Sequence, residues 1–316
     1  MASNILVVSG RASNHLAKKI AEVSDIKIAN VSMKTFSDGE FQPAYEDTIR
    51  GKEIFIIQST HTPADNLLEL LMMIDAAKRA SAKRVIAVIP YYGYARQDRK
   101  DKPRVPITSK LIADIISAAG VDRLVTMDLH ADQIQAYFNI PVDHLYASTI
   151  FVPYLINQNI PNLTIAAPDT GGTRRAAVYA KFVNADLAIT FKQRSREKVN
   201  QVDHMTLIGD VEGRNVVIVD DIIDTAGTIV KAAEMMLDNG AASVRAMCTH
   251  AILSGHAYDR IEKSNLTELF VTDTVPLRRE SSKIVVLSVA ELLADVIKRV
   301  SKNMSISGHF RFPTIM

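Results

Sequence analysis

The chain has 316 residues, of which 47% are hydrophobic, and this length is typical of two domains of roughly 150 residues each. Its 37 basic and 35 acidic side chains nearly cancel, so we expect neither a nucleic acid nor a membrane as a partner. One cysteine excludes an intrachain disulfide, and residues 1–8 lack the basic start of a signal peptide, so we expect a cytoplasmic protein.

Short apolar runs alternate with helical patterns along the chain. Strands are predicted at 5–8, 54–58, 85–89 and 124–127 in the first half, and at 163–167, 187–190, 205–208, 216–219, 244–249, 269–272 and 284–287 in the second. Helices are predicted at 14–21, 66–80, 107–119, 172–182, 228–237 and 289–300. This alternation is typical of α/β proteins with open, mostly parallel sheets that helices cover on both faces.

A weak internal repeat relates the two halves. Residues 119–131 align without gaps on residues 239–251, with Gly120 opposite Gly240 and His130 opposite His250. Both segments follow a predicted helix and contain a predicted strand. We therefore predict two related α/β domains, at 1–147 and 148–316. Because ligands in such sheets bind beyond the carboxyl ends of the strands, the residues just after each strand are the most informative.

Two loops in the first half carry candidate binding groups. Residues 35–41 form a turn with two acids and two aromatic side chains. Residues 90–100 follow a predicted strand and combine tyrosines with several basic groups, which suits base stacking and phosphate pairing. An ordinary surface loop explains either segment equally well.

Three further strand ends are candidates. His130 is either a ligand for a metal or phosphate, or a structural histidine. Residues 167–175 form a strand, a glycine turn and a helix, with Asp169 as a candidate magnesium ligand. Residues 191–198 are strongly cationic, although a solvated loop would show the same composition.

The stretch 215–229 is the most specific. Residues 216–219 are all β-branched, as in a strand buried on both faces, and we expect this strand to end at Asp220 and Asp221. Residues 224–228 then supply hydroxyls and a glycine before a helix, whose first amides and dipole favour an anion. With two carboxylates to accept hydrogen bonds from vicinal hydroxyls, the stretch predicts a sugar phosphate site. The alternative is an ordinary turn in which Asp224 caps the helix.

This stretch resembles the loop that binds phosphoribosyl diphosphate (PRPP) in phosphoribosyltransferases and in ribose-phosphate diphosphokinases. The chain is similar to the ribose-phosphate diphosphokinase (PRPP synthetase) family in the same order at 36–40, 54–59, 89–98, 104–108, 128–131, 168–169, 219–228 and 249–250. The resemblance implies two related phosphoribosyltransferase-like domains, each a mostly parallel sheet flanked by helices.

The resemblance also implies a role for each matched residue. Lys192 and Arg194 would be the catalytic pair on a mobile loop; some members carry an extra basic residue between them, where this chain has Gln193. The ATP-binding residues would be Phe36, Asp38, Gly39, Glu40, Arg96 and Gln97. Ribose 5-phosphate would be bound by Arg194, Asp220, Asp221, Asp224, Thr225, Ala226, Gly227 and Thr228. His130 and Asp169 would help to bind Mg²⁺.

The implied reaction moves the β,γ-diphosphoryl group of ATP onto the anomeric hydroxyl of ribose 5-phosphate, giving PRPP and AMP. The chain has no Gly-x-x-x-x-Gly-Lys-Ser/Thr loop, so nucleotide is not held as in P-loop enzymes. In the family the first ATP loop comes from a neighbouring subunit and homohexamers are common. Phosphate and ADP are the expected regulators, through Arg50, Ser81, Arg104, Ser305 and Ser307.

Two other functions would explain part of this sequence. A phosphoribosyltransferase shares the PRPP loop, but it does not explain Asp38, Glu40, Arg96 and Gln97 or the repeated half. A catalytically silent regulatory paralogue should have lost Lys192, Arg194 or His130, and this chain keeps all three.

Overall fold

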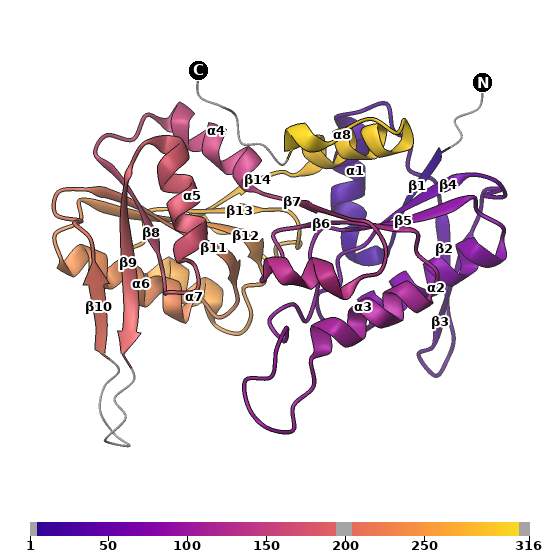
Figure 1. Cartoon of the computed structure of the whole chain (residues 1–316), viewed down its shortest axis with the longest axis horizontal. Helices are drawn as coiled ribbons and strands as arrows, with labels where there is room; N and C mark the ends of the chain where they lie inside the picture. Colours follow the sequence, from indigo (N-terminus) through magenta and orange to yellow (C-terminus); the bar gives the residue numbers. More distant parts are fainter. Residues whose placement is uncertain (1–4, 194–203, 310–316) are drawn as a thin grey trace. The chain divides into compact units, whose positions relative to one another are not determined.

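The computed structural model describes residues 5–193 and 204–309, which divide into two compact units. The first unit contains residues up to 146 together with 274–276 and 288–309, and the second contains 147–273 and 277–287. The division at 147 and 148 that we expect for the domains stays a prediction. The units differ from two continuous halves because the chain returns to the first unit near its end (Figure 1).

The first unit is built on a parallel sheet of five strands in the order β1-β4-β5-β6-β7. These strands are β1 (Ile5–Ser9), β4 (Glu53–Ile57), β5 (Arg84–Ile89), β6 (Arg123–Met127) and β7 (Val142–Leu145). Helices α1 (Asn14–Glu22) and α8 (Ala290–Ser301) pack together on one face, and α2 (Asp65–Arg79) and α3 (Thr108–Ala118) cover the other (Figure 1). Both faces are therefore apolar, and every residue of β4 is buried.

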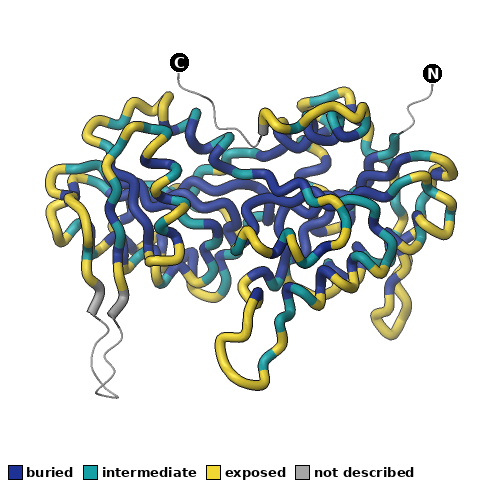
Figure 2. The backbone as a smooth tube through the Cα atoms, in the orientation of Figure 1, coloured by how far each residue is buried: buried dark blue, intermediate teal, exposed yellow. Residues whose placement is uncertain are grey.

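A two-stranded antiparallel hairpin belongs to the same unit. It consists of β2 (Val31–Thr35) and β3 (Phe41–Tyr45). Its turn, residues 36–40, is exposed, as Figure 2 shows in yellow. The Tyr45 hydroxyl donates a hydrogen bond to the Met73 carbonyl at 2.9 Å, which ties the far end of β3 to α2.

The second unit contains a sheet in the order β10-β9-β8-β11-β12-β13-β14. Its strands are β8 (Leu163–Ala167), β9 (Asp186–Gln193), β10 (His204–Ile208), β11 (Asn215–Ile223), β12 (Ser243–Ala251), β13 (Leu269–Thr272) and β14 (Ile284–Leu287). Only β9 and β10 pair antiparallel among these described strands. Helices α4 (Ser148–Gln158) and α5 (Thr173–Val183) lie on one face, and α6 (Gly227–Asp238) and α7 (Ala257–Lys263) on the other (Figure 1).

The expected α/β class with two mostly parallel sheets is confirmed, and every predicted strand and helix is present. One expectation was wrong: β11 does not end at Val219 but continues to Ile223. The reason is its partner, because β12 extends equally far and pairs with Asp220 through Cys248 and with Ile222 through His250. No helix within the described ranges is long and apolar enough to cross a membrane.

Candidate active site

The carboxyl ends of β8 and β11 meet at one edge of the second sheet. The two strands are parallel neighbours, with Ala166 paired to Ile218. Each strand is followed by a turn and a helix: β8 leads through residues 168–172 to α5, and β11 leads through residues 224–226 to α6. We call residues 224–228 the phosphate turn. Both turns therefore lie where ligands of open α/β sheets bind.

The phosphate turn leaves the start of α6 open. Ala226, the N-cap residue, has φ +61°, a left-handed conformation, and makes no side-chain capping bond. For alanine this conformation costs about 1–2 kcal/mol. The first backbone hydrogen bond from the helix to the turn is the one from Val230 N–H to the Ala226 carbonyl, at 3.1 Å. The amides before Val230 and the positive end of the helix dipole thus form an arrangement that suits an anion.

Asp224 does not cap α6, as it would in the alternative of an ordinary turn. The Asp224 carboxylate instead accepts a short hydrogen bond from the Ser254 hydroxyl. Thr225 and Thr228 are exposed, Asp224 and Gly227 are half-buried and Ala226 is buried. The turn therefore presents two threonines and a bare glycine to solvent at the helix start.

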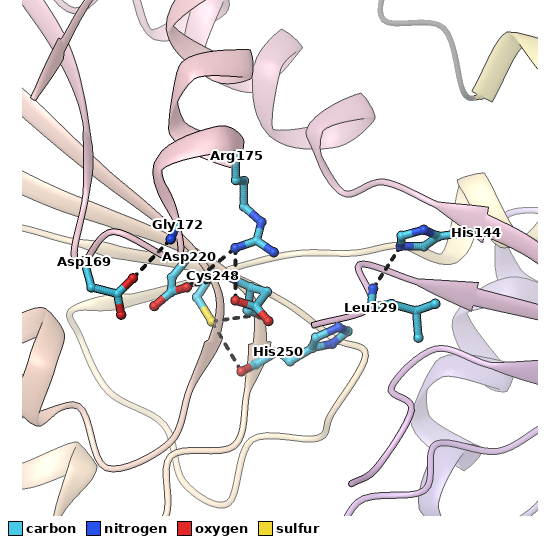
Figure 3. A network of polar contacts seen from close by, with 9 residues as sticks. Leu129, His144, Asp169, Gly172, Arg175, Asp220, Cys248 and His250 are labelled. Atoms are coloured by element: carbon cyan, nitrogen blue, oxygen red, sulfur yellow. Dashed lines mark hydrogen bonds and ion pairs between the residues drawn. The ribbon is translucent and has the colours of Figure 1, made fainter. Parts of the chain in front are cut away.

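Asp220 and Asp221 share one cation. Arg175 of α5 donates from Nη1 to Asp221 Oδ1 at 3.0 Å and lies 3.6 Å from Asp220 Oδ1 (Figure 3). Burial, and then the neighbouring Asp221 carboxylate, raise the pKa of Asp220 well above its usual range, while Arg175 opposes the shift. Asp221 is buried, whereas the side chain of Asp220 is 22% exposed. Asp220 is thus the acid of the pair with more room to meet a ligand.

The turn after β8 contains its own anion. Asp169 Oδ1 accepts the N–H of Gly172, the N-cap residue of α5, at 3.0 Å (Figure 3). Asp169 is exposed, so its carboxylate retains an oxygen directed to solvent. Carboxylate oxygens suit Mg²⁺, which usually takes one or two protein ligands and completes its shell with phosphate oxygens and water. Among the residues described, no group of three or more His, Cys, Asp or Glu could hold a metal by itself.

Lys192, one of the two residues predicted to be catalytic, lies on the strand beside β8. Lys192 is in β9 and pairs with Met205 of β10, three residues beyond the last pair that β9 forms with β8, Ala167 with Ile189. The backbone of β9 therefore carries Lys192 past the edge of the sheet where the two turns lie. Arg194 lies outside the described residues.

The predicted ATP loop is a tight turn in the first unit. Phe36 N–H donates to the Glu40 carbonyl at 2.8 Å, and Glu40 N–H donates to Asp38 Oδ1 at 3.1 Å. Gly39 has φ +96°, which favours glycine. The Phe36 ring is 39% exposed, with Lys34 Nζ 4.6 Å from its centroid. An exposed ring and two exposed acids at a hairpin tip are available to a ligand.

The other predicted ATP residues follow β5. Arg96 and Gln97 are exposed. Gln97 Oε1 accepts from the Thr108 hydroxyl at 2.5 Å, and its carbonyl accepts from Ser109 N–H at 3.1 Å, so the start of α3 fixes its position. Within the first unit, Figure 1 shows the loop after β5 apart from the tip of the β2–β3 hairpin. The structure therefore does not bring these two sets of residues together within one unit.

His130 is exposed just after β6. The buried His144 of β7 accepts the N–H of Leu129 on Nε2 at 2.9 Å, which fixes the backbone beside His130 (Figure 3). Sequence reasoning missed His144, Arg175 and Ser254, because each acts through a neighbour that is distant in the sequence. Arg175 was visible only as one of two arginines at the start of a predicted helix.

The predicted regulatory residues form two pairs in the first unit. Arg50 Nη1 donates to the Ser81 hydroxyl at 3.2 Å, and the Ser305 and Ser307 hydroxyls are 2.7 Å apart. Arg104 is exposed in the loop after β5, with φ +66°. The roles of all these residues, like those of the site residues, stay predictions.

Comparison with known proteins identifies the family. The family model described as the N-terminal domain of ribose phosphate pyrophosphokinase matches residues 5–120, and that of the phosphoribosyl synthetase-associated domain matches 184–311. A ribose-phosphate pyrophosphokinase of Porphyromonas gingivalis is 52% identical over 98% of this chain and 99% of its own length. The chain belongs to the ribose-phosphate pyrophosphokinase family.

Other members of the ribose-phosphate pyrophosphokinase family agree. One from Campylobacter jejuni is 50% identical over 96% of this chain and 98% of its own length. The crystal structure of phosphoribosylpyrophosphate synthetase from Mycobacterium smegmatis is similar with a TM-score of 0.89 at 36% identity, covering 95% of this chain and all of that one. The expected family and fold class are therefore confirmed.

Proposed function

We propose that this protein is a ribose-phosphate diphosphokinase, which transfers the β,γ-diphosphoryl group of ATP to the anomeric hydroxyl of ribose 5-phosphate and releases AMP. The observation that carries the proposal is the open start of α6, where the N-cap is an alanine that cannot supply a capping side chain. The 5-phosphate binds at the amides and hydroxyls of the phosphate turn. Asp220 accepts hydrogen bonds from the ribose hydroxyls, while Asp221 holds Arg175.

In the reaction, the anomeric oxygen forms a bond to the β-phosphorus, and the bond from that phosphorus to the bridging oxygen of AMP breaks. The proton of the anomeric hydroxyl is released to water. Charge on the moving oxygens is neutralised by Lys192 and Arg194, because phosphoryl-type transfer depends mostly on positioning and electrostatic stabilisation. Asp169 and His130 would each help to bind Mg²⁺, which would supply further charge neutralisation when bound.

ATP is bound by Phe36, Asp38, Gly39 and Glu40 of the hairpin turn and by Arg96 and Gln97 of the loop after β5. Since these two sets lie apart within the first unit, we propose that one ATP takes them from two copies of the chain. Oligomerisation, as a homohexamer in the cytoplasm, is then part of the catalytic site. A protein that sediments as a monomer under assay conditions and is fully active there would contradict this assignment.

Regulation is proposed at the two polar pairs of the first unit. Arg50 and Ser81, with Arg104, and the hydroxyls of Ser305 and Ser307 offer donors to a phosphate or to ADP. If this is correct, Ser81→Ala weakens activation by phosphate or inhibition by ADP without changing the KM for ribose 5-phosphate. Unchanged responses to both ions would remove the pair from the proposal.

The experiment that tests the function is incubation of the protein with ATP, Mg²⁺ and ribose 5-phosphate, followed by separation of the products. We expect equal amounts of AMP and PRPP, and neither when ribose 5-phosphate is omitted. ADP as the product would indicate transfer of one phosphoryl group. A phosphoribosyltransferase would instead consume PRPP with a nucleobase and release pyrophosphate, and a silent paralogue would form no product.

A further inference from the structure

The phosphate turn is held from one side by the segment 252–260, which connects β12 to α7 and includes the first turn of that helix. The carbonyl of Ile223, directly before the turn, accepts from the N–H groups of Ile252 and Leu253 at 3.0 and 3.1 Å. The next carbonyl, that of Asp224, accepts from Ser254 N–H at 2.9 Å. Ser254 also donates its hydroxyl to the Asp224 carboxylate.

The third consecutive carbonyl is held by a charged side chain. Arg260 of α7 donates from Nη1 to the carbonyl of Thr225 at 2.7 Å. The Nη1 atom also lies beside the first residue of α6, since a Cβ built on Gly227 would be 3.9 Å from it. Arg260 is exposed, so it does not pack in a hydrophobic core; its contribution here is to orient the backbone of the turn.

The hydrogen bonds to these three carbonyls also fix the direction of the amides on the opposite side of the turn. In a trans peptide the N–H of each residue points away from the carbonyl of the residue before it. The carbonyls of residues 223, 224 and 225 all point toward the segment 252–260, so the amides of residues 224, 225 and 226 point away from it. The hydrogen bond from Arg260 sets the last of these, the amide of the left-handed Ala226.

We propose that Arg260 is a positioning residue for ribose 5-phosphate: by holding the Thr225 carbonyl, it orients the phosphate turn so that its amides face the 5-phosphate. This rests on the proposed function, because it takes the turn as the site of the 5-phosphate. Hydrogen bonds from a charged donor are stronger than neutral ones, and the left-handed Ala226 needs such support to keep one conformation. Without Arg260 the turn keeps its sequence but not the direction of its amides.

The test compares Arg260→Ala, Arg260→Lys and Lys263→Ala in the full chain. Lys263 is the matched control, since it is an exposed cation on the same helix whose side chain makes no hydrogen bond or ion pair within the described part of the chain, and its loss changes the net charge equally. We measure kcat and the KM values for ribose 5-phosphate and ATP, and titrate ribose 5-phosphate into each variant by calorimetry.

We expect Arg260→Ala to raise the KM and Kd for ribose 5-phosphate about tenfold, as the loss of one charge-assisted hydrogen bond would. The KM for ATP should stay within about twofold, and Arg260→Lys should recover part of the affinity because an ammonium can donate one of the same bonds. A merely structural role would change the stability or both KM values together.

The proposal is overturned if Arg260→Ala binds ribose 5-phosphate as the parent does, or if Lys263→Ala weakens binding equally, which would indicate a general effect of charge. If Arg260→Ala does not fold, Arg260→Met takes its place, since methionine keeps the length of the side chain without a donor, and a methionine variant that binds ribose 5-phosphate as the parent does overturns the proposal. A parent protein that binds no ribose 5-phosphate would refute the proposed function instead, whatever the variants do.

Discussion

Two turns at the edge of the second sheet each connect a strand to a helix, but they offer a ligand groups of opposite charge. After β8, the N-cap residue Gly172 supplies no capping side chain, but the carboxylate of Asp169 accepts its N–H, so a negative charge lies beside the start of α5. After β11, the N-cap is the left-handed Ala226, and no side chain caps α6. The carboxylate of the turn after β8 suits a cation, while the open amides of the turn after β11 suit an anion. The proposed function accordingly places Mg²⁺ at the turn after β8 and the sugar phosphate at the turn after β11.

The largest effect should come from neither turn but from the strand next to β8. Lys192→Ala should lower kcat by about 10³-fold or more, since a positioned cation contributes that much to phosphoryl-type transfer. Circular dichroism should show an unchanged fold. Lys181→Ala, which removes an exposed cation in the last turn of α5, serves as the control and should keep its kcat. A kcat within a few-fold of the parent for Lys192→Ala would exclude the role.

The comparison of the turns is sharpest at their glycines. A Cβ on Gly227 would meet protein atoms no closer than 3.8 Å, and one on Gly172 no closer than 3.5 Å, so both alanine variants should fold. A methyl group on Gly227 would lie 3.8 Å from the Thr225 hydroxyl and 3.9 Å from Arg260 Nη1, so we expect it to displace the groups that form the phosphate turn and to raise the Kd for ribose 5-phosphate about 100-fold. Gly172→Ala should change it little. Equal Kd values for the two variants, by calorimetry, would mean that the turns do not differ as described.

Asp169→Ala removes the internal anion of the first turn. It should lower the free energy of unfolding by about 1 kcal/mol, as the loss of a capping side chain does. It should also raise the Mg²⁺ concentration that activity requires. Asp169→Asn keeps an oxygen for the Gly172 amide but loses the charge, so urea denaturation should find its stability intact while the Mg²⁺ requirement still rises. A stable Asp169→Ala variant would show that the bond contributes little.

Asp220 and Asp221, the acids near the end of β11, predict that the free energy of unfolding depends on pH in the absence of ligands. Because the pKa of Asp220 is raised above 3.8 by burial and by Asp221, the folded state holds a proton there more tightly than the unfolded state. Its contribution to stability is thus largest below pH 3.8 and falls as pH rises through the raised pKa. Asp220→Asn should therefore gain stability over the parent as the pH is raised from 4 to 8.

Asp259 gives the opposite control, since hydrogen bonds from Arg279 and then His256 lower its pKa. Its contribution is present above its usual value of 3.8 and is lost as pH falls through the lowered pKa. Asp259→Asn should then be less stable than its parent at pH 7, and the difference should vanish in acid. Urea denaturation across this range compares the two directly.

The smallest effect should come from the backbone of the phosphate turn. Ala226→Gly should raise the free energy of unfolding by up to about 1 kcal/mol, because glycine adopts φ +61° without steric cost. The greater conformational freedom of glycine in the unfolded chain offsets part of this gain. Affinity for ribose 5-phosphate should not improve, since a glycine holds the amides less firmly. Tighter binding by this variant would argue that the alanine strains the turn against its ligand.

Much of the fold could be predicted because its strands are apolar and its helices periodic. The elements that were missed lack those signals. The β2–β3 hairpin is largely exposed and contains Pro43, β7 buries the polar Asp143 and His144, and α4 contains Pro153 within the helix. Each is stabilised by tertiary contacts that no local pattern contains.

The internal repeat has a structural counterpart. Gly120, after α3, has φ +101°, and Gly240, after α6, has φ +89°, so each ends a helix in the left-handed conformation before β6 or β12 begins. The two repeated segments thus share the end of a helix as well as a strand. By contrast, the roles of Arg175 and Arg260 could not be predicted, because the residues to which they donate hydrogen bonds are 46 and 35 residues away in the sequence.

The single cysteine provides a natural reporter of opening in the second unit. Cys248 is fully buried in β12, where its thiol contacts the carbonyls of Asp221 and His250, and burial and the two nearby aspartates raise its pKa. An alkylating reagent needs an accessible thiolate, so it can react only with molecules in which this sheet has opened. The rate of labelling therefore counts such openings in the unaltered protein, and a ligand seated at the end of β11 should slow it.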